Sequence, residues 1–207
     1  MLSILGAAAR VLIGGKLLFD QTTQLYPEVQ GIPLREDSCQ EFIDTIAKTN
    51  GISNKILVRQ DCGESPSWAE AYNLGDLSTR HPQIVVSKDR LTNANDLKFA
   101  IAHELGHLRE HHGLIIQSIL MANIALFALP IIPIKAALAA ITFSAISIIP
   151  IFRCMEIRAD NFAFANCPKD VIECAFTKDT PIPTGIGRIF GGNIEKRTAA
   201  IHAHSTS

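Results

Sequence analysis

The sequence has no long run of like charge and no closely spaced pair of cysteines. Its 19 basic and 20 acidic residues give a formal net charge of −1. This balance provides no basic surface for nucleic acid, so we expect no nucleic-acid partner. The five cysteines are an odd number, and none of them has C-x-x-C spacing. The odd number of cysteines argues against a complete disulfide framework, and their spacing argues against a zinc site made of thiolates. We therefore expect the cysteines to be buried and reduced.

The apolar residues are concentrated rather than evenly spread. Within residues 114–152 the only charge is Lys135, and Pro130 and Pro133 divide this stretch into two arms. Each arm is about long enough to cross a hydrocarbon core of ~30 Å. A domain of this size has too little other material to cover two helices that are apolar on all sides. The pattern therefore predicts a helical hairpin that enters a lipid bilayer and returns.

A second apolar segment, residues 1–19, contains Arg10 and Lys16. A cation at the centre of a spanning helix costs roughly 2.5–3.5 kcal/mol. Arg10 falls near that centre, so a helix at the membrane interface or packed on the domain is favoured over a spanning one. No charged region precedes the segment, which argues against a signal peptide. A cleaved organellar presequence stays open, because no acid occurs before Asp20.

The remainder of the chain has the mixed pattern of a small α+β domain. Apolar residues at helical spacing predict helices, and short alternating runs bounded by turn residues predict strands. The expected helices cover residues 36–49, 155–166 and 195–202, another opens at the turn signal of residues 93–96, and the expected strands cover 55–59, 68–74 and 83–87. We therefore divide the chain into a membrane-associated segment with its linker, residues 1–34, and a domain of residues 35–207 that the hairpin at 114–152 interrupts.

One predicted helix carries the motif His103-Glu104-Leu105-Gly106-His107. Residues four apart share a helix face and lie about 6 Å apart along the axis, so His103 and His107 can bind one metal ion. Glu104 is rotated by about 100° and can act as general base toward a water on that ion. Gly106 favours helix poorly, which predicts that another backbone approaches closely there. The alternative is a chance match on an exposed helix.

A third protein ligand is required, and the residues directly after the motif do not supply it. The metzincin pattern needs a histidine where this chain has Gly113. His111 and His112 would lie one turn further along the same helix. We expect both to be solvated polar residues at the membrane boundary.

Glu156 and Asp160 are four residues apart and share one helix face. One carboxylate can bind the metal, while the other orients a metal-binding imidazole. Two other acids compete for the ligand role, Glu173 and Glu195. Neither has a second acid at helical spacing, so Glu156 is the better candidate.

The motif, the apolar hairpin and Glu156-x-x-Ala159-Asp160 together resemble the M48 family of membrane zinc peptidases, which includes HtpX-like, CAAX-prenyl-endopeptidase-like and mitochondrial inner-membrane proteases. The resemblance covers residues 68–201. It implies a mainly helical α+β fold of the gluzincin type, with a short sheet and an inserted transmembrane hairpin. It also implies one Zn²⁺ per subunit, with Glu156 as third ligand and Asp160 as the partner of a ligand.

The resemblance further implies an edge strand that binds an extended substrate backbone. The matching residues are Ala69, Glu70, Ala71, Tyr72 and Asn73. The family often stabilises the oxyanion with a His-Pro pair followed by an arginine near the C-terminus. Arg197 is present here, but Gly191 stands at the position of the histidine. Arg197 is the first candidate for that role, ahead of His202 and His204.

We therefore expect a membrane-embedded zinc endopeptidase that cleaves membrane-associated or misfolded proteins. The alternative is a catalytically weak or inactive membrane protein that uses zinc structurally. Arg109, Arg153 and Arg158 flank the hairpin on the active-site side, which predicts a bacterial inner membrane with that side in the cytoplasm. An organellar membrane is the alternative location, and the substrate and oligomeric state stay open.

Overall fold

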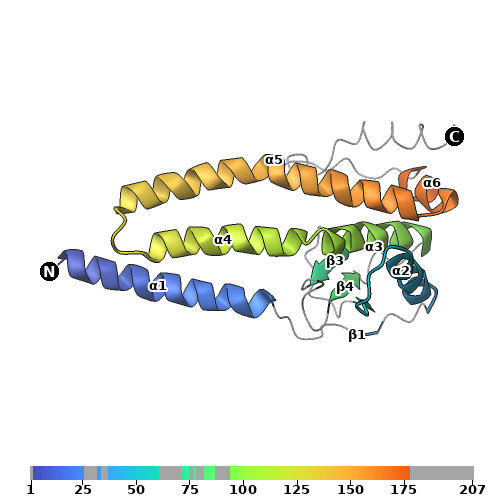
Figure 1. The fold of residues 1–207 in the computed structure, drawn as a ribbon, viewed down its shortest axis with the longest axis horizontal. Helices are drawn as coiled ribbons and strands as arrows, with labels where there is room; N and C mark the ends of the chain where they lie inside the picture. The colour runs from blue at the N-terminus through green and yellow to red at the C-terminus, as the bar shows by residue number, and fades with distance from the viewer. Residues whose placement is uncertain are drawn as a thin grey trace.

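A computed structural model describes residues 2–25, 32–33, 37–60, 71–74, 77, 82–86 and 94–177. Within these residues, three long helices lie side by side and extend away from a smaller body that contains the sheet (Figure 1). The long helices are α1 (Leu2–Leu25), α4 (His112–Ala128) and α5 (Ile134–Asn166). The smaller body contains β1 (Ile32–Pro33), α2 (Asp37–Thr49), β2 (Leu57–Gln60), β3 (Ala71–Leu74), β4 (Gln83–Val86), α3 (Ala94–Arg109) and α6 (Lys169–Thr177).

The sheet has four strands in the order β1-β2-β4-β3. β2 and β4 pair in parallel, and β3 pairs antiparallel with β4, so that Asn73 lies opposite Ile84. Every residue of β4 is buried, as expected of a central strand. β3 therefore forms one edge of the sheet, beside its most buried strand.

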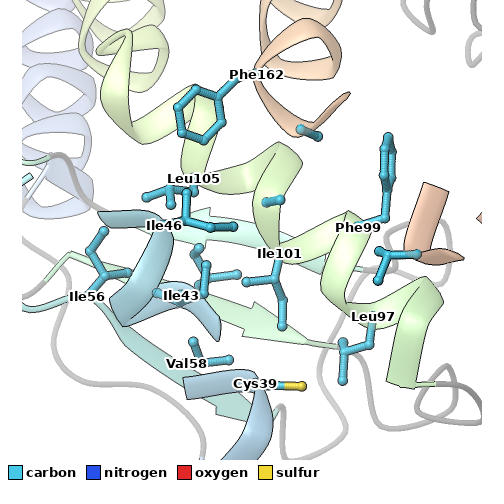
Figure 2. Packing of buried hydrophobic residues seen from close by; sticks show 14 of the residues in the cluster. Cys39, Ile43, Ile46, Ile56, Val58, Leu97, Phe99, Ile101, Leu105 and Phe162 are labelled. Carbon is cyan, nitrogen blue, oxygen red and sulfur yellow. The ribbon is translucent and has the colours of Figure 1, made fainter. Parts of the chain in front are cut away.

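The hydrophobic core lies between the sheet and the two helices α2 and α3. Cys39, Ile43 and Ile46 recur at helical spacing on α2 and are buried. They meet Ile101 and Leu105 of α3, as Figure 2 shows. α2 ends where the sequence predicts, at Asn50-Gly51, and Gly51 has a φ of 69°. The core thus holds α3 firmly against the sheet.

The hairpin consists of α4 and α5, with Pro130 and Pro133 in the turn between them. The second arm and the helix predicted at residues 155–166 are one continuous helix that contains Pro150. A proline removes one helical hydrogen bond. The residues next to it are apolar, and the helix continues through it with its remaining backbone bonds. α5 therefore extends from the hairpin tip into the body of the domain.

α5 is long and apolar enough to cross a membrane. α4 passes the same test only together with residues 97–109 of α3, from which it is bent by 54°. Large apolar side chains are exposed along both arms, among them Leu114, Leu120, Leu138, Phe143 and Ile146. The mainly helical α+β class, with a short sheet and an inserted hairpin, is confirmed.

α1 packs against α4 through a glycine. A Cβ atom added at Gly14 would lie 2.4 Å from the Cβ atom of Ala128, whereas one at Gly15 would have no atom within 4 Å. The absence of a side chain at Gly14 therefore permits close approach of the two helices.

Arg10 lies one helical turn before Gly14 and reaches the carboxyl end of α4. Its Nε donates to the carbonyl oxygen of Phe127 at 2.8 Å, and its Nη atoms donate to those of Ile132 at 2.9 Å and Leu129 at 3.1 Å. Carbonyl groups at the end of a helix carry partial negative charge and need donors. The sequence-based cost of Arg10 at the centre of a spanning helix takes no account of such partners, and the sequence gives no sign of them.

A pair of alanine substitutions in α1 tests this packing. Gly14→Ala places a methyl group against Ala128, and we expect the full-length chain in detergent micelles to lose about 1–3 kcal/mol of unfolding free energy. Gly15→Ala is the matched control, and removing a helical glycine there is expected to stabilise by up to about 1 kcal/mol. Thermal unfolding measures both. Equal effects of the two substitutions would contradict the contact between α1 and α4.

Candidate metal centre

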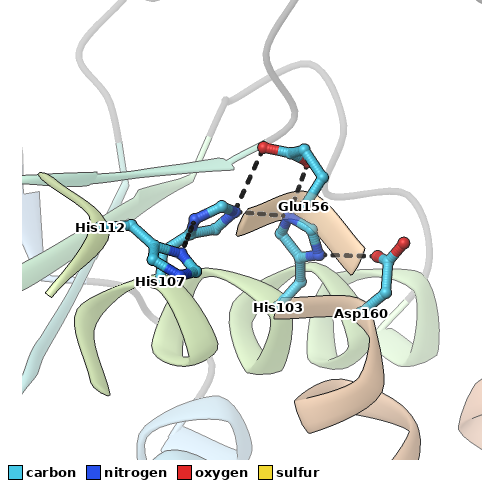
Figure 3. A network of polar contacts seen from close by, with 5 residues as sticks. All are labelled: His103, His107, His112, Glu156 and Asp160. Atoms are coloured by element: carbon cyan, nitrogen blue, oxygen red, sulfur yellow. Dashed lines mark hydrogen bonds and ion pairs between the residues drawn. The ribbon is translucent and has the colours of Figure 1, made fainter. Parts of the chain in front are cut away.

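The centre forms where α3 crosses α5. At the crossing, a Cβ atom added to Gly106 would lie 2.9 Å from the Cα atom of Ala159. The predicted close backbone approach at Gly106 is thus confirmed, and its partner is α5. Because the backbones are so close, side chains within one turn of the contact on each helix can meet over the crossing. These are His103 and His107 on α3 and Glu156 on α5 (Figure 3).

Two imidazole nitrogens and one carboxylate converge at this point. The Nε2 atoms of His103 and His107 are 3.0 Å apart. Glu156 places Oε2 3.4 Å from Nε2 of His103, and Oε1 3.4 Å from Nε2 of His107. The three side chains can each offer one ligand atom within 4.8 Å of the others.

This geometry fits a tetrahedral zinc ion. Zinc binds imidazole nitrogen and carboxylate oxygen at about 2.0–2.2 Å, so tetrahedral ligand atoms are separated by about 3.3–3.5 Å. The Nε2–Nε2 distance of 3.0 Å lies near that value, and each of the two nitrogens has a different oxygen of Glu156 at 3.4 Å. The donor set of two nitrogens and one oxygen also suits zinc.

Asp160 lies one turn after Glu156 on α5 and is buried. Its Oδ1 is 2.9 Å from Nδ1 of His103. The Nδ1–H of His103 can therefore donate to this carboxylate, which leaves the lone pair of Nε2 directed at the centre. The two acids predicted from their spacing thus lie on the two sides of one imidazole.

His112 does not lie where the sequence predicted. Its Nδ1 is 2.8 Å from Nδ1 of His107, and only 4% of the residue is exposed. The prediction of a solvated side chain assumed one continuous helix. Instead α3 ends at Arg109, His111 adopts a left-handed conformation with φ 56° and ψ 31°, and α4 starts in a new direction. Histidine is among the residues enriched in this conformation, but the sequence has no glycine or proline at the bend itself, residues 110–112. His111 is exposed, as the sequence predicted.

The charges around the centre favour a cation. Burial lowers the pKa of His103, but hydrogen bonds to Asp160 and Glu156 outweigh it and raise that pKa to about 10. Burial, followed by the charge on His103, lowers the pKa of His107 to about 4. Without a metal, the two imidazoles therefore hold a single positive charge between carboxylates. A divalent ion can take the place of that proton.

Glu104 points toward the edge of the sheet rather than into the ligand group. Burial raises the pKa of its carboxyl to about 7, and a hydrogen bond from the backbone N–H of Asn73 partly offsets this effect. A carboxylate with a pKa near neutrality can accept and return a proton at physiological pH. Among the predicted strand residues, Ala71, Tyr72 and Asn73 lie in β3. Ala69 and Glu70 fall outside the described residues.

Of the other predicted candidates, the structure describes only Glu173. Glu173 is on α6, where its carboxylate is 3.8 Å from Nζ of Lys169, and it does not belong to the ligand group. The remaining candidates fall outside the described residues: Gly191, Glu195, Arg197, His202 and His204. Sequence reasoning missed one residue of the centre, His112.

Two comparisons with known proteins found matches to this chain. The model of Peptidase family M48 matches residues 33–176. The crystal structure of S. mikatae Ste24p is similar with a TM-score of 0.52 and 20% sequence identity, over 82% of this chain and 50% of that chain. At this identity the likeness shows a shared fold alone, and the chain spans half the length of Ste24p. The comparison with curated proteins found no match.

Gly106→Ala tests the importance of the helix crossing. The added methyl group would overlap the backbone of Ala159, so α3 and α5 must move apart and carry the imidazoles away from Glu156. We expect a loss of about 1–3 kcal/mol of unfolding free energy, together with a lower zinc content per purified chain. Calorimetry and elemental analysis measure the two effects. Unchanged zinc content and unfolding temperature would show that the crossing tolerates a wider spacing.

Proposed function

Because the chain belongs to peptidase family M48, a family of metallopeptidases, we propose that it is a membrane-embedded endopeptidase with zinc held by His103, His107 and Glu156. The convergence of one ligand atom from each of these side chains, within 4.8 Å of one another, carries this proposal. The recognition of the family from sequence is confirmed by the match over residues 33–176.

The chain's own residues supply the acid–base chemistry. Zinc at this centre would polarise the scissile carbonyl and lower the pKa of the attacking water. Glu104 accepts a proton from that water and returns it to the leaving amine nitrogen. Its pKa near neutrality suits both steps. Asp160 holds the imidazole of His103 in one tautomer and orientation throughout.

A catalytic role is favoured over a purely structural one. Structural zinc sites in proteins have four protein ligands, whereas catalytic sites use three and leave a position for water or substrate. The ligand group here has three members within the described part of the chain. Glu104 lies beside them, half-buried and with a raised pKa. A structural site has no use for such a group.

The substrate is proposed to bind as an added strand along β3. β3 is at the edge of the described sheet, and its Asn73 backbone bonds to Glu104. An extended peptide on this edge would gain main-chain hydrogen bonds and pass beside the general base. Residues 69–73 would form the binding strand, and Arg197 would stabilise the oxyanion.

The hairpin of α4 and α5 is proposed to anchor the centre at a membrane surface. Its apolar side chains are exposed along both arms, as suits helices that face lipid. Three exposed arginines, Arg109, Arg153 and Arg158, lie toward the active-site end of the hairpin, and Lys135 lies at the tip. By the positive-inside rule the centre faces the cytoplasm. Substrates would then be membrane-associated or misfolded proteins that reach this surface.

Glu104→Gln tests the function. The amide keeps the shape of the side chain but cannot accept the proton, so zinc content should match that of the unchanged chain while cleavage falls by roughly 10²–10⁴-fold. The assay is cleavage of a fluorogenic peptide mixture by the full chain in detergent micelles, with product termini mapped by mass spectrometry. Glu41→Gln, on the exposed side of α2, is the matched control. Cleavage by the Glu104→Gln variant at the unchanged rate would remove Glu104 from the mechanism.

A further inference from the structure

His112 lies against the outer nitrogen of His107. The two Nδ1 atoms are 2.8 Å apart, and the rings meet edge to face with centroids 4.9 Å apart. His112 is the first residue of α4 and is 4% exposed. A short contact between two ring nitrogens requires that one of them donates a hydrogen and the other accepts it.

The direction of this hydrogen bond follows from the metal site. His107 presents its Nε2 to the centre, so in a neutral imidazole its hydrogen resides on Nδ1. That hydrogen needs an acceptor, because a buried donor without one costs about 1–3 kcal/mol. His112 can accept it only through an unprotonated Nδ1, with its own hydrogen on Nε2.

We propose that His112 is a positioning residue, which accepts the Nδ1–H of His107 and so directs the Nε2 of that ring at the zinc site. The proposal rests on the zinc centre proposed above. Each of the two zinc-binding histidines then donates its Nδ1–H to an outer partner, because His103 donates in the same way to Asp160. The partner of His103 is an anion on α5, whereas the partner of His107 is a neutral ring on α4.

The turn at His111 supports this role. A left-handed conformation costs a residue with a side chain roughly 1–2 kcal/mol, and such strain persists where the surrounding structure uses it. Here the turn redirects the chain by 54° between α3 and α4. On a continuous helix, His112 would lie one turn beyond His107 and point away from it. The strained residue thus places the imidazole of His112 against that of His107.

The same bond connects the hairpin to the metal centre. α4 contributes His112 to one imidazole, and α5 contributes Asp160 to the other. Each helix of the hairpin therefore contributes, at its end nearest the domain, one residue that fixes a proposed zinc ligand. A change in the spacing of the two arms would alter both outer hydrogen bonds.

The experiment measures zinc affinity of the full-length chain in detergent micelles by competition with a chelator. Removal of an outer partner of a metal-binding histidine weakens the metal by about 10–100-fold, and we expect this loss for His112→Ala. His112→Asn should recover most of the affinity, because its Oδ1 can accept the hydrogen from His107. The visible spectrum of the Co²⁺-loaded chain should change with His112→Ala and return with His112→Asn.

His111→Asn is the matched control. It changes the neighbouring histidine to a residue that tolerates the left-handed conformation, so zinc affinity and the Co²⁺ spectrum should stay unchanged. Equal zinc affinity in His112→Ala and the unchanged chain overturns the positioning role and leaves the zinc centre standing. Equal losses in His112→Ala and His112→Asn, with lowered unfolding temperatures, assign His112 to packing and overturn it as well. Failure of the unchanged chain to bind zinc removes the proposed function and this inference together.

Discussion

The close contact of α3 and α5 at Gly106 and Ala159 determines the rest of the structure. α3 carries both imidazoles and α5 carries both carboxylates that face them, so the distance between the two backbones sets the distances from Glu156 and Asp160 to the imidazoles. On its other side, α3 is fixed by the core through Ile101 and Leu105. α5 continues from the crossing into the hairpin. One contact between small residues therefore joins the core, the metal centre and the apolar arms.

The polar groups of the centre are paired although an apolar core surrounds them. Asp160 faces His103, His112 faces His107, and the Asn73 backbone faces Glu104. Pairing offsets most of the cost of removing these groups from water. The two carboxylates that face His103 and His107 suit a cation at this point. A bound cation would link α3 to α5, so metal binding and correct packing of the domain would support one another.

Much of this arrangement follows from sequence spacing. Helical periodicity brings His103 and His107 to one face of α3. In the same way it brings Glu156 and Asp160 to one face of α5, and neither placement depends on the tertiary fold. The contribution of His112 depends on a left-handed residue, His111, that no glycine marks. The continuity of α5 through Pro150 runs against the local propensity of proline to end a helix, so this feature could not be read from the sequence. The position of β3 beside Glu104 depends on strand order, which pairs segments distant in sequence.

The three carbonyl partners of Arg10 have a consequence for the order of assembly. Phe127 follows Arg10 by 117 residues, and the other two partners come later still. While the chain is being synthesised, α1 is made long before the carbonyl groups that receive its guanidinium. Until then the guanidinium has none of these carbonyl partners, and water satisfies its donors. The contact between α1 and the end of α4 can therefore form only after both arms of the turn at residues 129–132 have been made.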